Sequence, residues 1–199
     1  MYQFIKRAVD IAGSLFGCII LSPFFLTIML LIKMDSKGPV FFRQIRVGKN
    51  GELFKIYKFR TMVDKAEEMG PLISKGDDRR ITGTGRFLRK YKLDELPQLF
   101  NVLSGKMSLV GPRPEVPRFV NTYRDQYEII LKIKPGMTDY ASVKYKNEND
   151  ILNGVENVEE KYIRDILPRK ITYYEKYIRE KNIAKDIKII FRTIVEIFK

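Results

Sequence analysis

The pattern of hydrophobic and polar positions is dominated by one long apolar segment near the start of the chain. No charged residue occurs from Ile11 to Ile32. A helix of that length would extend about 33 Å, which is enough to cross a bilayer. Ser22-Pro23 falls in its middle, where proline removes a backbone donor and clashes with the preceding turn. The pattern therefore predicts a membrane helix that is kinked or broken at Ser22-Pro23.

Positive residues flank this segment on both sides. Lys6 and Arg7 precede it and further basic residues follow it, so translocation of either end is resisted. We expect a re-entrant helical hairpin over residues 1–36, in which Ser22 takes up a backbone group freed by Pro23. A straight signal anchor with a proline kink and a buried helix of a soluble protein are the alternatives. A cleaved signal peptide is disfavoured, because no small-x-small cleavage site follows the apolar stretch.

The end of the chain shows a second pattern, in which apolar residues recur at helical spacing opposite basic ones. The apolar positions are Ile183, Ile187, Ile190, Ile194 and Phe198, and the basic ones are Lys185, Lys188, Arg192 and Lys199. Such a helix suits the surface of a membrane. A helix packed on the core of its own domain fits the same spacing.

The segment between these ends predicts a compact α+β domain over residues 37–199. Residues 39–61 have the pattern of a β-hairpin, because two apolar strands flank Gly48-Lys49-Asn50-Gly51 and Asn-Gly favours a tight hairpin turn. Residues 64–79 indicate a short helix and a flexible loop, and residues 86–92, 95–104 and most of 158–199 indicate helices. The pattern thus predicts one compact domain with a β-hairpin and several helices.

Composition narrows the chemistry. The chain of 199 residues has no His and one Cys, so Ser/His/Asp and Cys/His catalysis, His-ligated zinc and Cys-cluster metals are excluded. A divalent metal, if one binds, must be a hard ion on oxygen ligands. The net charge of +13 indicates an anionic partner, which nucleic acid, an acidic membrane and a phosphorylated substrate all satisfy.

Groups able to do chemistry concentrate between residues 86 and 97. Arg86, Arg89 and Lys90 share one helical face just ahead of Asp94 and Glu95. A carboxylate attacks a phosphoryl centre when nearby cations neutralise the charge of the substrate. An equally good reading makes Asp94 the N-cap of the following helix.

Three further cations are candidates for binding a diphosphate. Lys58 and Arg60 share one face of the second hairpin strand, and Arg113 is held between two prolines. Taken alone, each of these three cations is read more simply as a solvated surface charge. The hypothesis rests on their convergence with the two adjacent carboxylates.

These residues resemble a known family, the bacterial sugar transferases that act as monotopic phosphoglycosyl transferases on polyprenyl phosphate. The similarity covers the chain from its start to about residue 115. It runs through Lys6-Arg7 with Asp10, Ser22-Pro23, Gly38-Pro39-Val40-Phe41-Phe42-Arg43-Gln44, Tyr57-Lys58-Phe59-Arg60-Thr61-Met62, Arg80-Ile81-Thr82, Leu93-Asp94-Glu95-Leu96-Pro97-Gln98-Leu99, Asn101-Val102-Leu103 and Met107-Ser108-Leu109-Val110-Gly111-Pro112-Arg113-Pro114.

The resemblance implies a ping-pong reaction on the cytosolic face of the bacterial inner membrane. By matching position, Asp94 would attack the β-phosphate of a UDP-sugar and expel UMP, and undecaprenyl phosphate would then take the phosphosugar. Glu95 would bind Mg²⁺, while Lys58, Arg89 and Arg113 would contact phosphates or nucleotide. Both termini would be cytoplasmic, and the product would begin a cell-surface glycan such as an O-antigen, a capsule, an exopolysaccharide or a glycoprotein glycan.

One segment departs from the family pattern. Many members read Pro-Gly-Ile-Thr-Gly-Trp-Ala-Gln-Val-Asn-Gly-Arg, where this chain has Pro135-Gly136-Met137-Thr138-Asp139-Tyr140-Ala141-Ser142-Val143-Lys144-Tyr145-Lys146. The departures spare the carboxylate pair and the cations. We therefore expect residues 137–146 to affect sugar selection or local packing and to leave the chemistry intact.

Two rival functions come from other classes. A membrane-tethered nucleic-acid binder is suggested only by the charge, and the chain lacks interleaved exposed aromatics and a known reading motif, so we expect no nucleic-acid partner. A basic scaffold without catalysis would recruit other glycan enzymes to the membrane, but the intact Asp94, Glu95 and Arg113 speak against it. A homodimer and association with other enzymes of the glycan pathway are left open.

Overall fold

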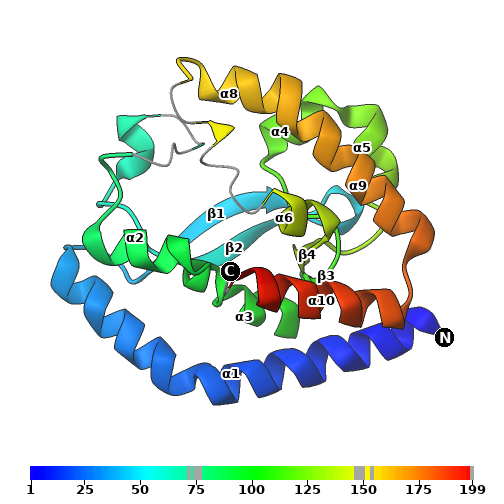
Figure 1. Cartoon of the computed structure of the whole chain (residues 1–199), viewed down its shortest axis with the longest axis horizontal. Helices are drawn as coiled ribbons and strands as arrows, with labels where there is room; N and C mark the ends of the chain where they lie inside the picture. Colours follow the sequence, from blue (N-terminus) through cyan, green and yellow to red (C-terminus); the bar gives the residue numbers. More distant parts are fainter. Residues whose placement is uncertain (71–72, 74–77, 146–150, 153–154, 198–199) are drawn as a thin grey trace.

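The computed structural model describes residues 1–70, 73, 78–145, 151–152 and 155–197. Among the positions interpreted above, Pro71, Gly76, Lys146, Phe198 and Lys199 lie outside the described residues. The protein mixes helices with two small sheets, and its longest element is the apolar N-terminal helix α1, Tyr2–Asp35. Figure 1 shows this helix along one side of the molecule and the other elements above it.

Helix α1 is continuous through Pro23 and bends near its middle (Figure 1). Proline cannot donate to the carbonyl of Ile19, four residues earlier, and the Ser22 hydroxyl donates to that oxygen instead at 2.8 Å. This confirms the predicted role of Ser22. By length and composition α1 is able to cross a membrane, so it is a candidate membrane anchor.

The inner side of α1 packs on the rest of the chain along its whole length. The Arg7 guanidinium donates to the carbonyls of Val102 and Leu103 at 2.7 and 2.9 Å. These bonds cap the C-terminal end of the short helix that ends at Leu103. The Asp10 carboxylate accepts from the Ser108 hydroxyl at 3.0 Å and from the Leu109 amide at 2.9 Å. Further along, Phe25, Ile28 and Ile32 are buried.

The outer side of α1 is apolar and exposed. Its large side chains with at least half of their surface in solvent are Phe4, Leu15, Phe16, Ile19, Ile20, Phe24, Leu26, Leu30 and Met34. A row of apolar side chains this long is unusual on a protein surface that faces water. One side of α1 therefore packs on the folded chain, and the composition of the other side suits an apolar medium.

The predicted hairpin is confirmed. Strand β1, Phe41–Val47, pairs antiparallel with β2, Leu53–Phe59, in a register that places Phe41 opposite Phe59. The short helix η1, Lys49–Gly51, makes the turn, and Asn50 and Gly51 have φ of 57° and 80°. Asn and Gly tolerate the left-handed region best, so this turn is built from the residues that suit it.

A second sheet was not anticipated from the sequence. Strand β3, Ser108–Val110, pairs parallel with β4, Gly136–Thr138. Just beyond the pair, a Cβ atom on Gly136 would overlap the backbone of Gly111, so the two chains approach this closely only because both residues are glycine. This sheet fixes the position of the loop that follows Gly111.

The remaining helices cover the two sheets. After the short helix η2, Ala66–Met69, come α2, Gly83–Lys90, η3, Leu93–Glu95, and α3, Gln98–Leu103. The largest core cluster lies among the later elements, which are α4, Pro117–Thr122, α5, Arg124–Ile130, α6, Tyr140–Lys144, α8, Val158–Lys161, the π-helical turn η4, Tyr162–Ile166, and α9, Leu167–Glu180.

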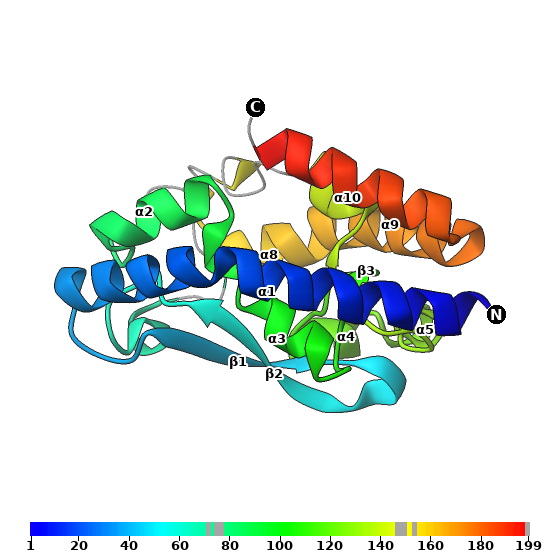
Figure 2. The same ribbon diagram turned by 90° about the horizontal axis from the view of Figure 1, so that it is seen from below.

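The last helix, α10, confirms the helical spacing of the C-terminal pattern. Helix α10, Ile183–Ile197, buries Ile189 against the core, whereas Ile187, Phe191 and Ile194 are exposed. Figure 2 shows α10 on one side of α1 and the hairpin on the other. Part of the helix packs on its own domain and part of it presents apolar side chains outward.

The expectation that one helix covers residues 95–104 is wrong in detail. A 3₁₀ turn, η3, holds Leu93–Glu95, and α3 begins at Gln98 with Pro97 as its N-cap. Asp94 is therefore not the cap of α3, and its carboxylate is left for another role. The predicted helix 86–92 begins earlier, at Gly83, because the Thr82 hydroxyl caps α2 by accepting from the Gly85 amide at 3.0 Å.

Candidate active site

The adjacent acids Asp94 and Glu95 lie in η3, between α2 and α3. The chain enters this turn through Lys92, whose φ is 55°. Asp94 is only 8% exposed, and both acids line a cavity of about 1140 Å³. Ligand pockets in proteins are usually about 300 to 1,000 Å³, so this cavity is large enough for a sizeable substrate.

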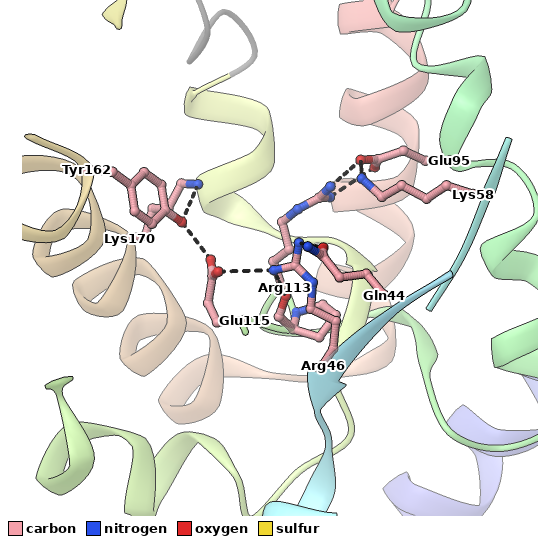
Figure 3. A network of polar contacts seen from close by, with 9 residues as sticks. Gln44, Arg46, Lys58, Glu95, Arg113, Glu115, Tyr162 and Lys170 are labelled. Atoms are coloured by element: carbon pink, nitrogen blue, oxygen red, sulfur yellow. Dashed lines mark hydrogen bonds and ion pairs between the residues drawn. The ribbon is translucent and has the colours of Figure 1, made fainter. Parts of the chain in front are cut away.

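Glu95 is held by two cations (Figure 3). Lys58 Nζ, from β2, lies 2.9 Å from Glu95 Oε1. Arg113 donates through Nη1 to Glu95 Oε2 at 2.9 Å and through Nη2 to Oε1, a two-pronged pairing. The three side chains carry a net charge of +1 at the wall of the cavity, so this wall attracts an anion.

The electrostatics of the two acids differ. Burial alone would raise the pKa of Glu95, but the charges of Arg113 and Lys58 hold that pKa well below its ordinary value. Burial raises the pKa of Asp94, and the negative charge of Glu95 adds to the rise. Burial also lowers the pKa of Lys58, against the attraction of Glu95. Glu95 is thus fixed as an anion, while Asp94 keeps a more basic carboxylate.

Asp94 makes no hydrogen bond or ion pair to any residue that the structure describes. A buried carboxylate normally has partners, because leaving it unpaired costs free energy. Its neighbour Glu95 has two cations bound to it. One acid is engaged and the other is free to react with something in the cavity.

The other predicted cations also reach the cavity wall. Arg89, on α2, lines the cavity and donates from Nε to the Thr61 hydroxyl at 2.8 Å. Arg60 lines it too, but is 5% exposed and donates from Nη2 to the Ser36 carbonyl at 2.7 Å and to its hydroxyl at 2.9 Å. Arg60 therefore joins the end of α1 to the hairpin, and its Nε and Nη1 atoms have no partner among the described residues.

Sequence reasoning missed a second polar cluster on the same cavity (Figure 3). Glu115 accepts from the Tyr162 hydroxyl at 2.6 Å and pairs with Arg46 at 3.3 Å. Lys170 donates to the Tyr162 hydroxyl at 3.3 Å, and Arg46 donates to Gln44 at 2.7 Å. Glu115 directly follows the Arg113-Pro114 motif, which was a usable signal, whereas no pattern in the sequence connects Tyr162 or Lys170 to it.

Asp139, in the divergent segment, supports the loop that carries Arg113. This residue is 1% exposed, and burial raises the pKa of its carboxyl group. Its Oδ2 accepts from the Arg113 amide at 3.0 Å, and its Oδ1 accepts from the Ser142 amide at 2.5 Å as the N-cap of α6. The difference from the family pattern at residue 139 therefore contacts Arg113, the residue that pairs with Glu95.

Asp139→Ser should separate these two contacts. Serine is as good an N-cap as aspartate, so the contact to the Ser142 amide should be kept. The hydrogen bond to the Arg113 amide is lost, and a bond to a charged group is worth about 1.5 to 3 kcal/mol of stability, so the melting temperature should fall by several degrees. The loop that carries Arg113 loses this support, so the enzymatic rate should also fall, by roughly tenfold. A lowered melting temperature with a normal rate would show that Asp139 supports the fold without positioning Arg113.

Asp94 and Glu95 are the carboxylates closest to the predicted magnesium contact. No group of three or more Asp, Glu, Cys or His that would hold a metal by itself occurs among the described residues. Magnesium is often held by one or two carboxylates together with substrate phosphates and waters, and Asp94 and Glu95 supply two adjacent carboxylates. Both Glu95 oxygens are paired with Lys58 and Arg113 in this structure, so the predicted Glu95 contact requires one of these cations to give way when the metal binds with its ligand.

Comparison with known proteins gives matches along the whole chain. The sequence profile for bacterial sugar transferases matches residues 1–199. A UDP-N-acetylgalactosamine-undecaprenyl-phosphate N-acetylgalactosaminephosphotransferase of Aeromonas hydrophila is 37% identical over 197 residues, 98% of this chain and 44% of that protein. A UDP-glucose:undecaprenyl-phosphate glucose-1-phosphate transferase of Klebsiella pneumoniae is 40% identical over 197 residues, 97% of this chain and 40% of that protein.

A third relative has a different sugar in its name. An undecaprenyl-phosphate galactose phosphotransferase of Salmonella typhimurium is 36% identical over 206 residues, 96% of this chain and 40% of that protein. This chain thus spans less than half of the length of each of these three relatives. Three sugars appear at nearly the same identity, so identity does not select among them.

Proposed function

This chain belongs to the bacterial sugar transferase family, and on that premise we propose that it transfers a sugar-1-phosphate from a UDP-sugar to undecaprenyl phosphate and releases UMP. The names of its relatives give this reaction class for those proteins. One observation about this chain carries the proposal furthest. Asp94 is a buried carboxylate without a described partner, beside a Glu95 that two cations engage, at the wall of a large cavity.

The first half-reaction uses Asp94 as the nucleophile. An Asp94 carboxylate oxygen attacks the β-phosphorus of the UDP-sugar, and the bond from that phosphorus to the oxygen bridging the two phosphates breaks. UMP leaves with the bridging oxygen and its electron pair. The sugar phosphate stays on Asp94 as an acyl phosphate, and the raised pKa of Asp94 agrees with its use as a nucleophile.

The second half-reaction reverses the direction of transfer. A phosphate oxygen of undecaprenyl phosphate attacks the same phosphorus, the bond to Asp94 breaks, and the carboxylate is restored. The product is an undecaprenyl diphosphate sugar. Because the same nucleophile serves both steps, both substrates must place a phosphate at the same position in turn. The single cavity that contains Asp94 fits this requirement.

The cations stabilise negative charge on the transferring phosphoryl group. Lys58 and Arg113 lie beside the acids, and Arg89 lines the same cavity. Glu95 orients Lys58 and Arg113, so that their positions are set before substrate arrives. Glu95 would hold Mg²⁺ only if Lys58 or Arg113 turned from it to the phosphates of the substrate, and the metal would then neutralise the diphosphate and favour departure of UMP.

The position of α1 supports a membrane protein whose chain ends share the cytoplasmic side. Near the start of α1, Lys6 pairs with Asp186 of α10 at 2.8 Å. At its other end, the Asp35 carboxylate accepts from the Thr84 amide at 2.8 Å. A helix that crossed a bilayer would separate its ends by an apolar core of about 30 Å, yet both ends of α1 bind the same folded body. We therefore favour re-entry at the Ser22-Pro23 bend.

This topology is tested by labelling cysteines in whole cells. In a Cys18→Ser background, Gln3→Cys and Lys37→Cys should both resist a membrane-impermeant maleimide in intact cells and react with it after lysis. Reaction of the cysteine at position 3 in intact cells would place the start of α1 in the periplasm and contradict the proposal.

The reaction itself is tested by UMP release. Detergent-solubilised protein receives Mg²⁺, undecaprenyl phosphate and, in turn, UDP-N-acetylgalactosamine, UDP-glucose, UDP-galactose and a wider set of UDP-sugars. With one donor, release beyond one UMP per protein molecule that requires the acceptor lipid and is lost on chelation would support the proposal and name the sugar. Absence of release over the whole set would favour a scaffold without catalysis.

A further inference from the structure

The cavity that contains the two acids has walls of two kinds. One part is lined by the charged side chains of Lys58, Asp94, Glu95 and Arg113. Another part is lined by apolar residues of α1 and α10, with Leu99, Leu109 and Met137 between them. A cavity with a cationic part and an apolar part is complementary to an amphiphile with an anionic head.

Each helix contributes one stripe to this wall. On α1 the lining residues Val9, Gly13, Gly17 and Leu21 repeat every four positions, with Phe16 beside them. On α10 the lining residues Ile190, Thr193, Ile194 and Ile197 follow the spacing of one helical face, and Glu196 lines the cavity beside them. The wall is thus made of two mainly apolar helix faces turned toward one opening.

Two glycines keep the α1 stripe flat. A Cβ atom at Gly13 would lie 2.9 Å from Leu109 Cδ1, and one at Gly17 would lie 3.2 Å from Leu99 Cδ1. The leucines therefore occupy the space that larger residues at these positions would take. They form an apolar floor between the charged wall and the membrane-facing helix.

The opening between the helices leads to an apolar surface. The helices meet where Lys6 pairs with Asp186, and Figure 2 shows them diverging from there toward the end of α10. Around this opening Phe16 is 67% exposed and Ile194 is 50% exposed, although both also line the cavity. A lipid in the same membrane layer as these helices would reach the cavity without crossing water.

We propose that the apolar wall between α1 and α10 binds the isoprenoid units next to the phosphate of a polyprenyl phosphate and delivers that phosphate to the cationic wall. The inference rests on the proposed function and assigns this part of the cavity to the acceptor lipid. An anionic phospholipid also joins an acyl chain to a phosphate. Its phosphate is a diester that carries a glycerol, whereas a polyprenyl phosphate ends in a compact monoester able to reach the acids.

The first test changes the size and the polarity of the opening between α1 and α10. Ile194→Trp fills the opening, and Ile194→Ser makes it polar. Each should raise KM for undecaprenyl phosphate about tenfold or more, because the tail loses apolar contact area. KM for the UDP-sugar and for a water-soluble acceptor with one or two isoprene units should stay within about twofold of wild type, since neither depends on the tail contacts.

Phe191 provides the matched control. It lies on the same helix, is 66% exposed and does not line the cavity, so Phe191→Trp and Phe191→Ser should leave KM for undecaprenyl phosphate near the wild-type value. Equal effects of the two positions, or equal effects on long and short acceptors, would overturn the inference. So would an unchanged KM in both Ile194 variants.

A binding readout separates this inference from the proposed reaction. Asp94→Asn protein is irradiated with a polyprenyl phosphate that carries a diazirine on its second isoprene unit, and the labelled peptides are identified by mass spectrometry. Labels on residues 9–21 and 190–197 are expected, and the Ile194→Trp change should reduce them.

The same experiment with a diazirine-bearing phosphatidylglycerol gives the comparison. Equal labelling by the phospholipid would overturn selective binding of the polyprenyl chain. The reaction is judged separately, by UMP release from the wild-type protein. Labelling of the apolar wall without any UMP release would sink the proposed function and leave the lipid site standing.

Discussion

Replacing Asp94 with Asn is expected to abolish UMP release, with a rate at least about a thousandfold below wild type. The amide keeps the shape of the carboxylate but lacks the anionic oxygen that attacks phosphorus. Asp94 has no described partner to lose, so the fold should survive and the melting temperature should change little. Loss of the nucleophile without loss of structure is the signature that the covalent mechanism requires.

The measurement is UMP release beside circular dichroism and thermal melting. Asp125→Asn, on the exposed surface of α5, is the matched control and should behave as wild type. Wild-type-like turnover in the Asp94→Asn protein would end the covalent mechanism through this residue. A collapsed melting temperature would instead assign Asp94 a structural role.

Glu95→Gln is expected to lower kcat by about a hundredfold to a thousandfold, comparable to the loss of a group that stabilises the transition state. Gln is neutral and its amide group donates, whereas Lys58 and Arg113 both need an acceptor there. Two half-buried cations would then face each other without their shared counter-charge. Lys58 and Arg113 would move apart, and they would no longer be positioned to stabilise the phosphoryl group in the transition state.

Two companion variants sharpen this second result. Glu95→Asp keeps the charge on a shorter side chain and should recover part of the rate. Glu128→Gln, an exposed change on α5, should have no effect. A Glu95→Gln enzyme with a wild-type rate would show that Glu95 neither orients the cations nor serves a metal.

The sequence predicted the parts of the fold that local patterns specify. Asn50-Gly51 between two apolar strands predicted the hairpin. Pro23 in an apolar run predicted the bend in the helix and the hydrogen bond from Ser22. The cluster of Asp94, Glu95 and Arg113 was also predicted in outline, because a specific motif carries each of these residues.

Other parts depend on contacts that no local pattern records. Strands β3 and β4 are three residues each and lie far apart along the chain, so neither has a detectable alternation. The pairing of Glu115 with Tyr162 joins residues 47 positions apart. The sequence left Asp94 open between a helix cap and a reactive carboxylate, because both have the same sequence signal at a turn; the structure shows that it is not the cap of α3.

The position of Asp139 illustrates a third kind of gap. Its divergence from the family pattern was visible in the sequence, but its effect was not. Only the parallel pairing of β3 with β4 brings the divergent segment beside the loop of Arg113, where the carboxylate accepts from the Arg113 amide. A substitution that spares the proposed catalytic residues thus still contacts the backbone of Arg113.

The most direct test of the covalent account is intact-mass spectrometry of the protein after incubation with its UDP-sugar and Mg²⁺ but without acceptor lipid. The account predicts a mass increase equal to one sugar phosphate, removed by added undecaprenyl phosphate and absent from the Asp94→Asn protein. UMP release that requires both substrates together, with no adduct on the wild-type protein, would contradict it.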